Sequence, residues 1–204
     1  VKKDLLRGLR KNEEDIFYYI VSKGNPDLGL SFDVDDNSIS ILKLRPFKNN
    51  TNAQWKVLRI DNSDDYPSVT DNSPIKDVVL VNKGTGKAMK YRNKEKGTEI
   101  TQVDLAEADN NYILWSIDSK QNDGARAVHP NNNESMVLDG WTAKLVDGCE
   151  KMGKFIIREW AELISKPITF GAREQKVFNH VNLPAVKDEL SITLRLKLED
   201  YASD

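Results

Sequence analysis

Short apolar or alternating stretches, separated by polar turn clusters, fill the chain from about residue 17 to residue 117. They cover residues 17–21, 29–34, 39–44, 54–60, 78–81, 88–91, 100–105 and 112–117. Strands of this length at intervals of about 8–12 residues predict an all-β sandwich or barrel. Residues 1–16 are an N-terminal extension, in which Leu5, Leu6, Leu9 and Ile16 could share one face of a helix, although Gly8 weakens that prediction.

Three segments of the chain open alike, which predicts an internal repeat. They begin at residues 19, 79 and 127, and each is followed by a polar turn and two further strands, the third of them at residues 39–44, 99–105 and 154–160. The first two copies close on Trp55 and Trp115, 60 residues apart, and the third should close near Phe170. Three such copies around a shared core predict a β-trefoil over residues 17–170, with the closing aromatics buried at equivalent places.

Composition narrows the function classes. The 204 residues include one cysteine and two histidines and carry a net charge of −2, so we expect neither a disulfide framework nor a nucleic-acid surface. Cys149, His129 and Asp139 have the residue types of a catalytic triad, but no nucleophile motif surrounds Cys149. We therefore expect no enzyme, no cofactor and no metal site. We see neither an 18-residue apolar run nor a signal peptide, which leaves a cytoplasmic, nuclear or secreted location open.

Several stretches resemble the ricin-B-type β-trefoil lectins, and most closely the plant lectins of the Euonymus lectin family. They are residues 19–30, 79–90, 111–115 and 137–139, of which Leu80 to Lys90 is the strongest piece. The closing Gln-x-Trp motif of such repeats is degraded at Trp55 and Trp115 and missing from the third copy. The resemblance implies a lectin that binds glycans or glycoproteins without catalysis.

The resemblance also implies where sugar would bind. A ricin-type site combines a carboxylate after the second strand, an aromatic ring near the third strand and an amide near the closing motif. In the third repeat these positions hold Asp139 and Trp160, flanked by Gly140 and Trp141, and we expect them to line one exposed pocket. The alternative is structural: Trp160 and Trp141 would belong to the packing, and Asp139 would fix its own turn.

The other two repeats match the pattern of a ricin-type sugar site less completely. The second repeat has Lys90 at the carboxylate position, which predicts an inactive site. The first repeat has a partial set, with Asp33 as the carboxylate, Phe47 as the ring and Asn52 as the amide. We predict a secondary carbohydrate site there.

The pattern of apolar residues within 171–204 predicts a C-terminal β extension. Residues 190–198 alternate strictly, with Leu190, Ile192, Leu194, Leu196 and Leu198 on one face. Such a strand needs a sheet to dock on, in the trefoil, in the preceding residues or in another protomer of a homo-oligomer. Residues 177–201 also resemble the opening strands of a laminin-G or concanavalin-type sandwich, which implies a partial second β domain of a longer protein.

Two other functions stay open beside the lectin. A pore-forming or membrane-active protein could use a lectin trefoil to deliver a β-rich C-terminal module, so that membranes would be contacted only through glycans or an oligomeric pore. A trefoil can also serve protein–protein contact alone.

Overall fold

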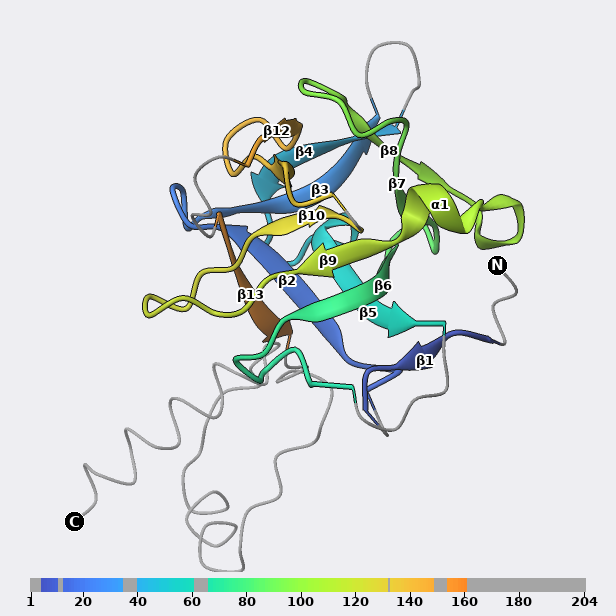
Figure 1. Ribbon diagram of the computed structural model, residues 1–204, viewed down its shortest axis with the longest axis horizontal. Coiled ribbons are helices and arrows are strands. Elements are labelled where there is room, and N and C mark those ends of the chain that lie inside the picture. The colour runs from blue at the N-terminus through green and yellow to red at the C-terminus, as the bar shows by residue number, and fades with distance from the viewer. Residues whose placement is uncertain are drawn as a thin grey trace, which may run out of the picture. The chain divides into compact units, whose positions relative to one another are not determined.

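The computed structural model describes residues 5–10, 13–34, 40–60, 66–131, 133–148 and 154–160. They form a β-rich body with three one-turn helices, which confirms the all-β prediction (Figure 1). The chain divides into two compact units, Val1–Trp160 and Ala161–Asp204. Phe170 and the alternating segment 190–198 lie outside the described residues.

The strands are short and come in chain order. They are β1 (Arg7–Gly8), β2 (Phe17–Ser22), β3 (Leu28–Val34), β4 (Ser40–Pro46), β5 (Gln54–Arg59), β6 (Ile75–Asn82), β7 (Ala88–Tyr91), β8 (Ile100–Val103), β9 (Trp115–Ile117), β10 (Val128–Pro130), β11 (Met136–Leu138), β12 (Leu145–Asp147) and β13 (Phe155–Trp160). The helical turns are η2 (Thr51–Ala53), η3 (Leu105–Glu107) and α1 (Asn110–Ile113).

Seven strands pair into a closed ring in the order β2, β3, β4, β8, β7, β6, β5 and back to β2, all antiparallel. Each strand of the ring therefore pairs with two others of the ring, which reduces exposed sheet edges. Outside the ring, β1 pairs with β5, β9 pairs with β6 and β10, and β13 runs along β2, while β11 and β12 form a separate hairpin (Figure 1).

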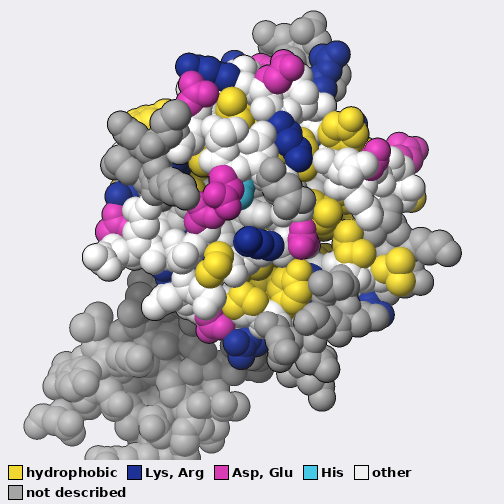
Figure 2. All heavy atoms as spheres, in the orientation of Figure 1, with side chains coloured by type: hydrophobic (Ala, Val, Ile, Leu, Met, Phe, Trp, Pro, Cys, Tyr) yellow, Lys and Arg dark blue, Asp and Glu magenta, His cyan; other side chains and the backbone are white. Residues whose placement is uncertain are grey.

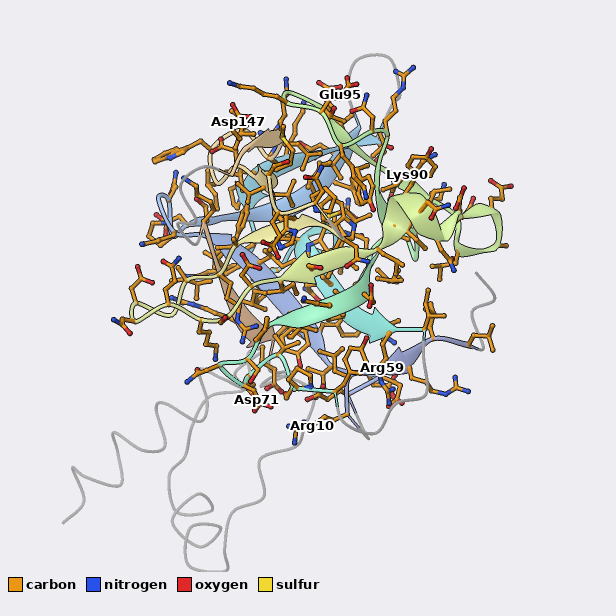
Figure 3. The ribbon with its side chains drawn as sticks, in the orientation of Figure 1. Arg10, Arg59, Asp71, Lys90, Glu95 and Asp147 are labelled. Carbon is orange, nitrogen blue, oxygen red and sulfur yellow. The ribbon has the colours of Figure 1, made fainter. Side chains whose placement is uncertain are left out.

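The N-terminal stretch forms a strand where the sequence predicted a helix. Arg7–Gly8 pairs with Leu58 and Arg59 of β5, and Arg59 Nε donates a hydrogen bond to the Gly8 carbonyl at 2.9 Å (Figure 3). Leu6 and Leu9, placed on one helical face by the pattern, are buried in two different core clusters. The sheet edge offered by β5 therefore outweighs the weak local helix preference.

The two closing tryptophans occupy equivalent environments, as predicted. Both rings are fully buried; Trp55 Nε1 donates to the Leu30 carbonyl at 2.9 Å, and Trp115 Nε1 donates to the Met89 carbonyl at 3.0 Å. Leu30 and Met89 both lie in the second strand of their repeat. A buried indole N–H needs an acceptor, and the same backbone position supplies it twice.

Aromatic packing and strand pairing repeat in the same way. Phe32 lies two residues after Leu30, and its ring centroid is 5.3 Å from that of Trp55. Tyr91 lies two residues after Met89, and its ring centroid is 5.0 Å from that of Trp115. Each tryptophan also pairs with the last residue of the following repeat's first strand, Trp55 with Asn82 and Trp115 with Pro130.

The third repeat closes earlier than the sequence predicted. Phe155 is fully buried and pairs with Ser22, the last residue of β2, just as Trp55 and Trp115 pair with Asn82 and Pro130. Phe155 is therefore the third closing aromatic, β13 is the closing strand, and β12 is the third strand. The assignment of residues 154–160 to the third strand is therefore corrected, because this strand pairs with β2 in the way that β5 pairs with β6. Phe155 follows Trp115 by 40 residues, where Trp115 follows Trp55 by 60.

Candidate functional site

The carboxylate of Asp139 organises the turn between β11 and β12. Its Oδ2 accepts hydrogen bonds from Trp141 N at 3.2 Å, Thr142 N at 2.8 Å and Thr142 Oγ1 at 2.9 Å. The Asp139 backbone carbonyl also accepts from Ala143 N at 3.1 Å, where Ala143 has a φ of 55°. Local side-chain bonds of this kind define an Asx turn. Asp139 thus holds the backbone that carries Trp141.

Trp141 is the most exposed large hydrophobic side chain among the described residues, at 66%. Gly140 anchors it, because the Gly140 carbonyl accepts a 2.6 Å hydrogen bond from Ser22 Oγ at the end of β2. The indole lies against Gly24, where an added Cβ would come within 2.6 Å of the ring. The ring is therefore positioned by the turn after β2 while most of its surface stays in solvent.

A groove of about 450 Å³ opens beside Trp141. Its apolar part comes from β3 and β4, and its polar part consists of three cationic side chains, a carboxylate and a hydroxyl. The lining residues are Leu28, Ile41, Leu42, Lys43, Leu44, Arg45, Glu99, Trp141, Thr142 and Lys144. Lys144 Nζ lies 3.7 Å from Glu99 Oε1, and Arg45 forms an ion pair with Asp33. An exposed indole ringed by donors and acceptors can stack on the apolar face of a polyhydroxylated ligand and bind its hydroxyls.

The structure does not bring Trp160 into this site. Trp160 pairs with Phe17 at one end of the β2–β13 ladder, whereas Gly140 contacts Ser22 at the other end. Five residues of strand separate the two ends, roughly 17 Å at about 3.3 Å per residue. The expected single pocket shared by Asp139 and Trp160 is therefore absent, because Trp160 lies five residues beyond the closing aromatic Phe155.

The secondary set from the first repeat is also dispersed. Phe47 is 5% exposed and packs on Tyr19 at 4.8 Å, so its ring is part of a small core cluster and offers no stacking face. Asn52 faces the turn after β6, where its Oδ1 would lie 2.0 Å from a Cβ added to Gly84. Asp33 forms an ion pair with Arg45, which lines the groove beside Trp141, but Asp33 is not itself among the lining residues.

Sequence reasoning missed the charged residues and the hydroxyl of this groove. The alternation in β4 places Lys43 and Arg45 on the same face, which was readable from the pattern. Glu99 and Lys144 join them only through tertiary contact, since they lie 45 positions apart in the chain.

His129, which lies away from the groove, is engaged by the fold. Both ring nitrogens of the buried His129 face acceptors at 2.9 Å, Nε2 toward Asp118 Oδ1 and Nδ1 toward the Pro130 carbonyl. Burial alone would lower the pKa of His129, but these two hydrogen bonds and the nearby negative charge raise it overall. Both ring nitrogens of His129 are thus engaged by the fold. Cys149 and His180 lie outside the described residues.

The remaining surface observations concern charge, metals and membranes. Acidic and basic side chains are interspersed on the face seen in Figure 2. Across the described part of the chain, no cluster of three or more His, Cys, Asp or Glu side chains could hold a metal ion. None of the helices within those residues is long and apolar enough to cross a bilayer.

Comparison with known proteins finds distant structural likenesses only. No family model matches the chain, and no curated protein matches it. Among solved structures, it is similar to ThreeFoil, a designed threefold-symmetric protein, with a TM-score of 0.48 and 17% identity over 69% of this chain and 96% of the other. It is also similar to a structure described as the PSL1a-E64 complex, with a TM-score of 0.35 and 15% identity over 73% of this chain and 44% of the other.

Proposed function

We propose that this protein is a non-enzymatic lectin that binds glycans or glycoproteins in the groove beside Trp141. The observation that carries the proposal is the 66% exposed indole of Trp141, fixed by the Asp139 turn at the rim of a 450 Å³ groove with cationic, anionic and hydroxyl groups. Trp141 lines the groove together with polar and charged groups, and an indole ring in such a setting is suited to stack on the apolar face of a ligand whose hydroxyls those groups bind.

The proposal includes a β-trefoil fold. Its support is the threefold recurrence of a closing aromatic, Trp55, Trp115 and Phe155, each buried and each paired with the last residue of a repeat's first strand. The closure of the third repeat onto β2 joins the last copy to the first, as three copies around one axis require.

The roles of the sequence-predicted residues change within this proposal. Trp141, first expected to flank the site, becomes the stacking ring. Asp139 becomes the residue that positions it, since its Oδ2 already accepts three hydrogen bonds from the turn. Lys43, Thr142 and Glu99 are the groups placed to contact sugar hydroxyls, at charge-assisted strengths of roughly 1.5–3 kcal/mol for the ionised ones.

A glycan array probed with the intact chain tests the proposal. The matched variants are Trp141→Ala and Tyr112→Ala, because Tyr112 is an exposed aromatic, at 40%, on the distant helix α1. We expect the parent and Tyr112→Ala to bind the same glycans, and Trp141→Ala to bind them about tenfold or more weakly, the equivalent of about 1.4 kcal/mol.

Thermal unfolding of each variant is the control, and Trp141→Ala should unfold close to the parent because its side chain is mostly in solvent. An array without any bound glycan would refute the lectin proposal. Glycan binding that survives Trp141→Ala unchanged would refute the groove as its site.

A further inference from the structure

A second pocket, of about 350 Å³, is lined by residues of β5 and β6 together with Leu6, Phe17 and Leu105. Four aliphatic side chains supply its apolar surface: Leu6, Leu58, Val81 and Leu105, each 7–9% exposed. They belong to one core cluster, so the pocket opens onto the rim of a packed core. Its volume falls in the range of about 300–1,000 Å³ that is typical of small-molecule sites.

Two ammonium groups stand at this pocket beside the same aromatic ring. Lys56 Nζ lies 5.2 Å and Lys83 Nζ 4.6 Å from the centroid of the Phe17 ring, and all three residues line the pocket. The two nitrogens are therefore at most about 10 Å apart. Lys83 Nζ also lies 3.8 Å from the centroid of the Trp160 ring.

The carboxylate of Asp15 binds Lys56 weakly. Lys56 Nζ is 3.4 Å from Asp15 Oδ1, and the Asp15 side chain is 98% exposed. An exposed ion pair of this kind contributes only about 0–1 kcal/mol, so it competes weakly with another anion for Lys56. Among the described residues that line the pocket, Glu14 is acidic and Lys56 and Lys83 are basic, so this part of the lining carries more positive than negative charge.

We infer that this pocket binds a small amphiphilic carboxylate, independently of the glycan groove, with which it shares no lining residue. The carboxylate would lie between the ammonium groups of Lys56 and Lys83, and the hydrocarbon part would cover the four aliphatic side chains. An uncharged apolar ligand would form no charge-assisted bond to either ammonium group, and an amphiphilic cation would be repelled by them.

Hexanoate and its uncharged isostere hexanamide form a matched pair of probes, to be titrated into the full chain by ligand- and methyl-detected NMR. We expect hexanoate to bind with a Kd in the millimolar range, on the order of what a ligand of so few atoms can reach. Hexanamide should bind about five- to tenfold more weakly, because it cannot form charge-assisted bonds to two ammonium groups.

Lys56→Met and Lys83→Met keep much of the aliphatic stem and remove the charge, and each should weaken hexanoate about five- to tenfold while leaving hexanamide unchanged. Lys76→Met, an exposed lysine of β6 outside the pocket, is the control and should bind hexanoate like the parent. The hexanamide measurement on the same samples separates loss of charge recognition from misfolding.

Three results would overturn the inference: no hexanoate binding up to about 20 mM, equal affinity for hexanoate and hexanamide, or full affinity in both lysine variants. None of these bears on glycan binding at Trp141, so the two proposals can fail separately.

Discussion

Replacing each closing tryptophan by phenylalanine tests whether the repeats are equivalent in energy as well as in geometry. In the parent protein, Trp115 Nε1 donates a hydrogen bond to the Met89 carbonyl at 3.0 Å. Trp115→Phe removes this donor and leaves the carbonyl without it. An unsatisfied buried acceptor costs about 1–3 kcal/mol. The lost ring volume, on the order of 40 Å³, adds about 1 kcal/mol at ~24 cal/mol per Å³ of cavity. The sum is about 2–4 kcal/mol.

Trp55→Phe should cost the same, because its Nε1 meets the Leu30 carbonyl at 2.9 Å and its ring is equally buried. Urea unfolding followed by far-ultraviolet circular dichroism measures the free energy of unfolding of both variants. In thermal unfolding, the melting temperature of each variant should fall by about 5–15 °C. Trp141→Phe is the control, expected within about 0.5 kcal/mol of the parent since Trp141 is 66% exposed.

Unequal costs would refute this reasoning. If one buried variant lost about 3 kcal/mol and the other less than about 0.5 kcal/mol, the two tryptophans would share a position without sharing a structural role. If both matched the Trp141→Phe control, the indole hydrogen bonds would contribute nothing measurable to the fold.

Three further predictions concern the histidine and the Trp141 turn. The pKa of His129 is raised in the fold, so its protonated form stabilises the protein; that contribution is full below the unfolded pKa of about 6.5 and is lost as pH rises through the folded value. Urea unfolding at a series of pH values should show this loss in the parent and a much smaller one in Asp118→Asn; equal pH profiles would contradict it. Asp139→Ala should lower the free energy of unfolding by about 1–2 kcal/mol, because Oδ2 holds three hydrogen bonds of the turn; an unchanged urea midpoint would show that the turn forms without them. Gly24→Ala should weaken glycan binding with little change in thermal unfolding, because the new Cβ would lie 2.6 Å from the Trp141 ring; binding equal to the parent's would mean that the ring can shift and still serve its ligand.

Much of the strand pattern was readable from the sequence because alternation and turn chemistry are local. The run at residues 88–91 became β7 with the same bounds, and the stretch 83–87 forms the hairpin turn, closed by a 2.9 Å hydrogen bond from Asn82 N to the Lys87 carbonyl. The equivalence of Trp55 and Trp115 was also readable, since two copies with one spacing define their own register.

The tertiary structure alone decided where the third repeat closes. The sequence pattern pointed to closure near Phe170, but the closing strand is the one that completes the pairing with β2, and β13 does so with Phe155 opposite Ser22. The partner strand lies more than 130 positions earlier in the chain. No local pattern records such a pairing, because loop length changes the spacing freely at little cost in free energy.

Part of the candidate site could also be predicted from the sequence, and part depended on the tertiary structure. The sequence drew attention to Asp139, Gly140 and Trp141, because a carboxylate–glycine–aromatic turn is a local feature. Burial is not local, so Phe47 could be offered as a stacking ring although it packs against Tyr19. Whether an aromatic ring is core or surface depends on which strands cover it, and that is settled only when segments distant in sequence pack together.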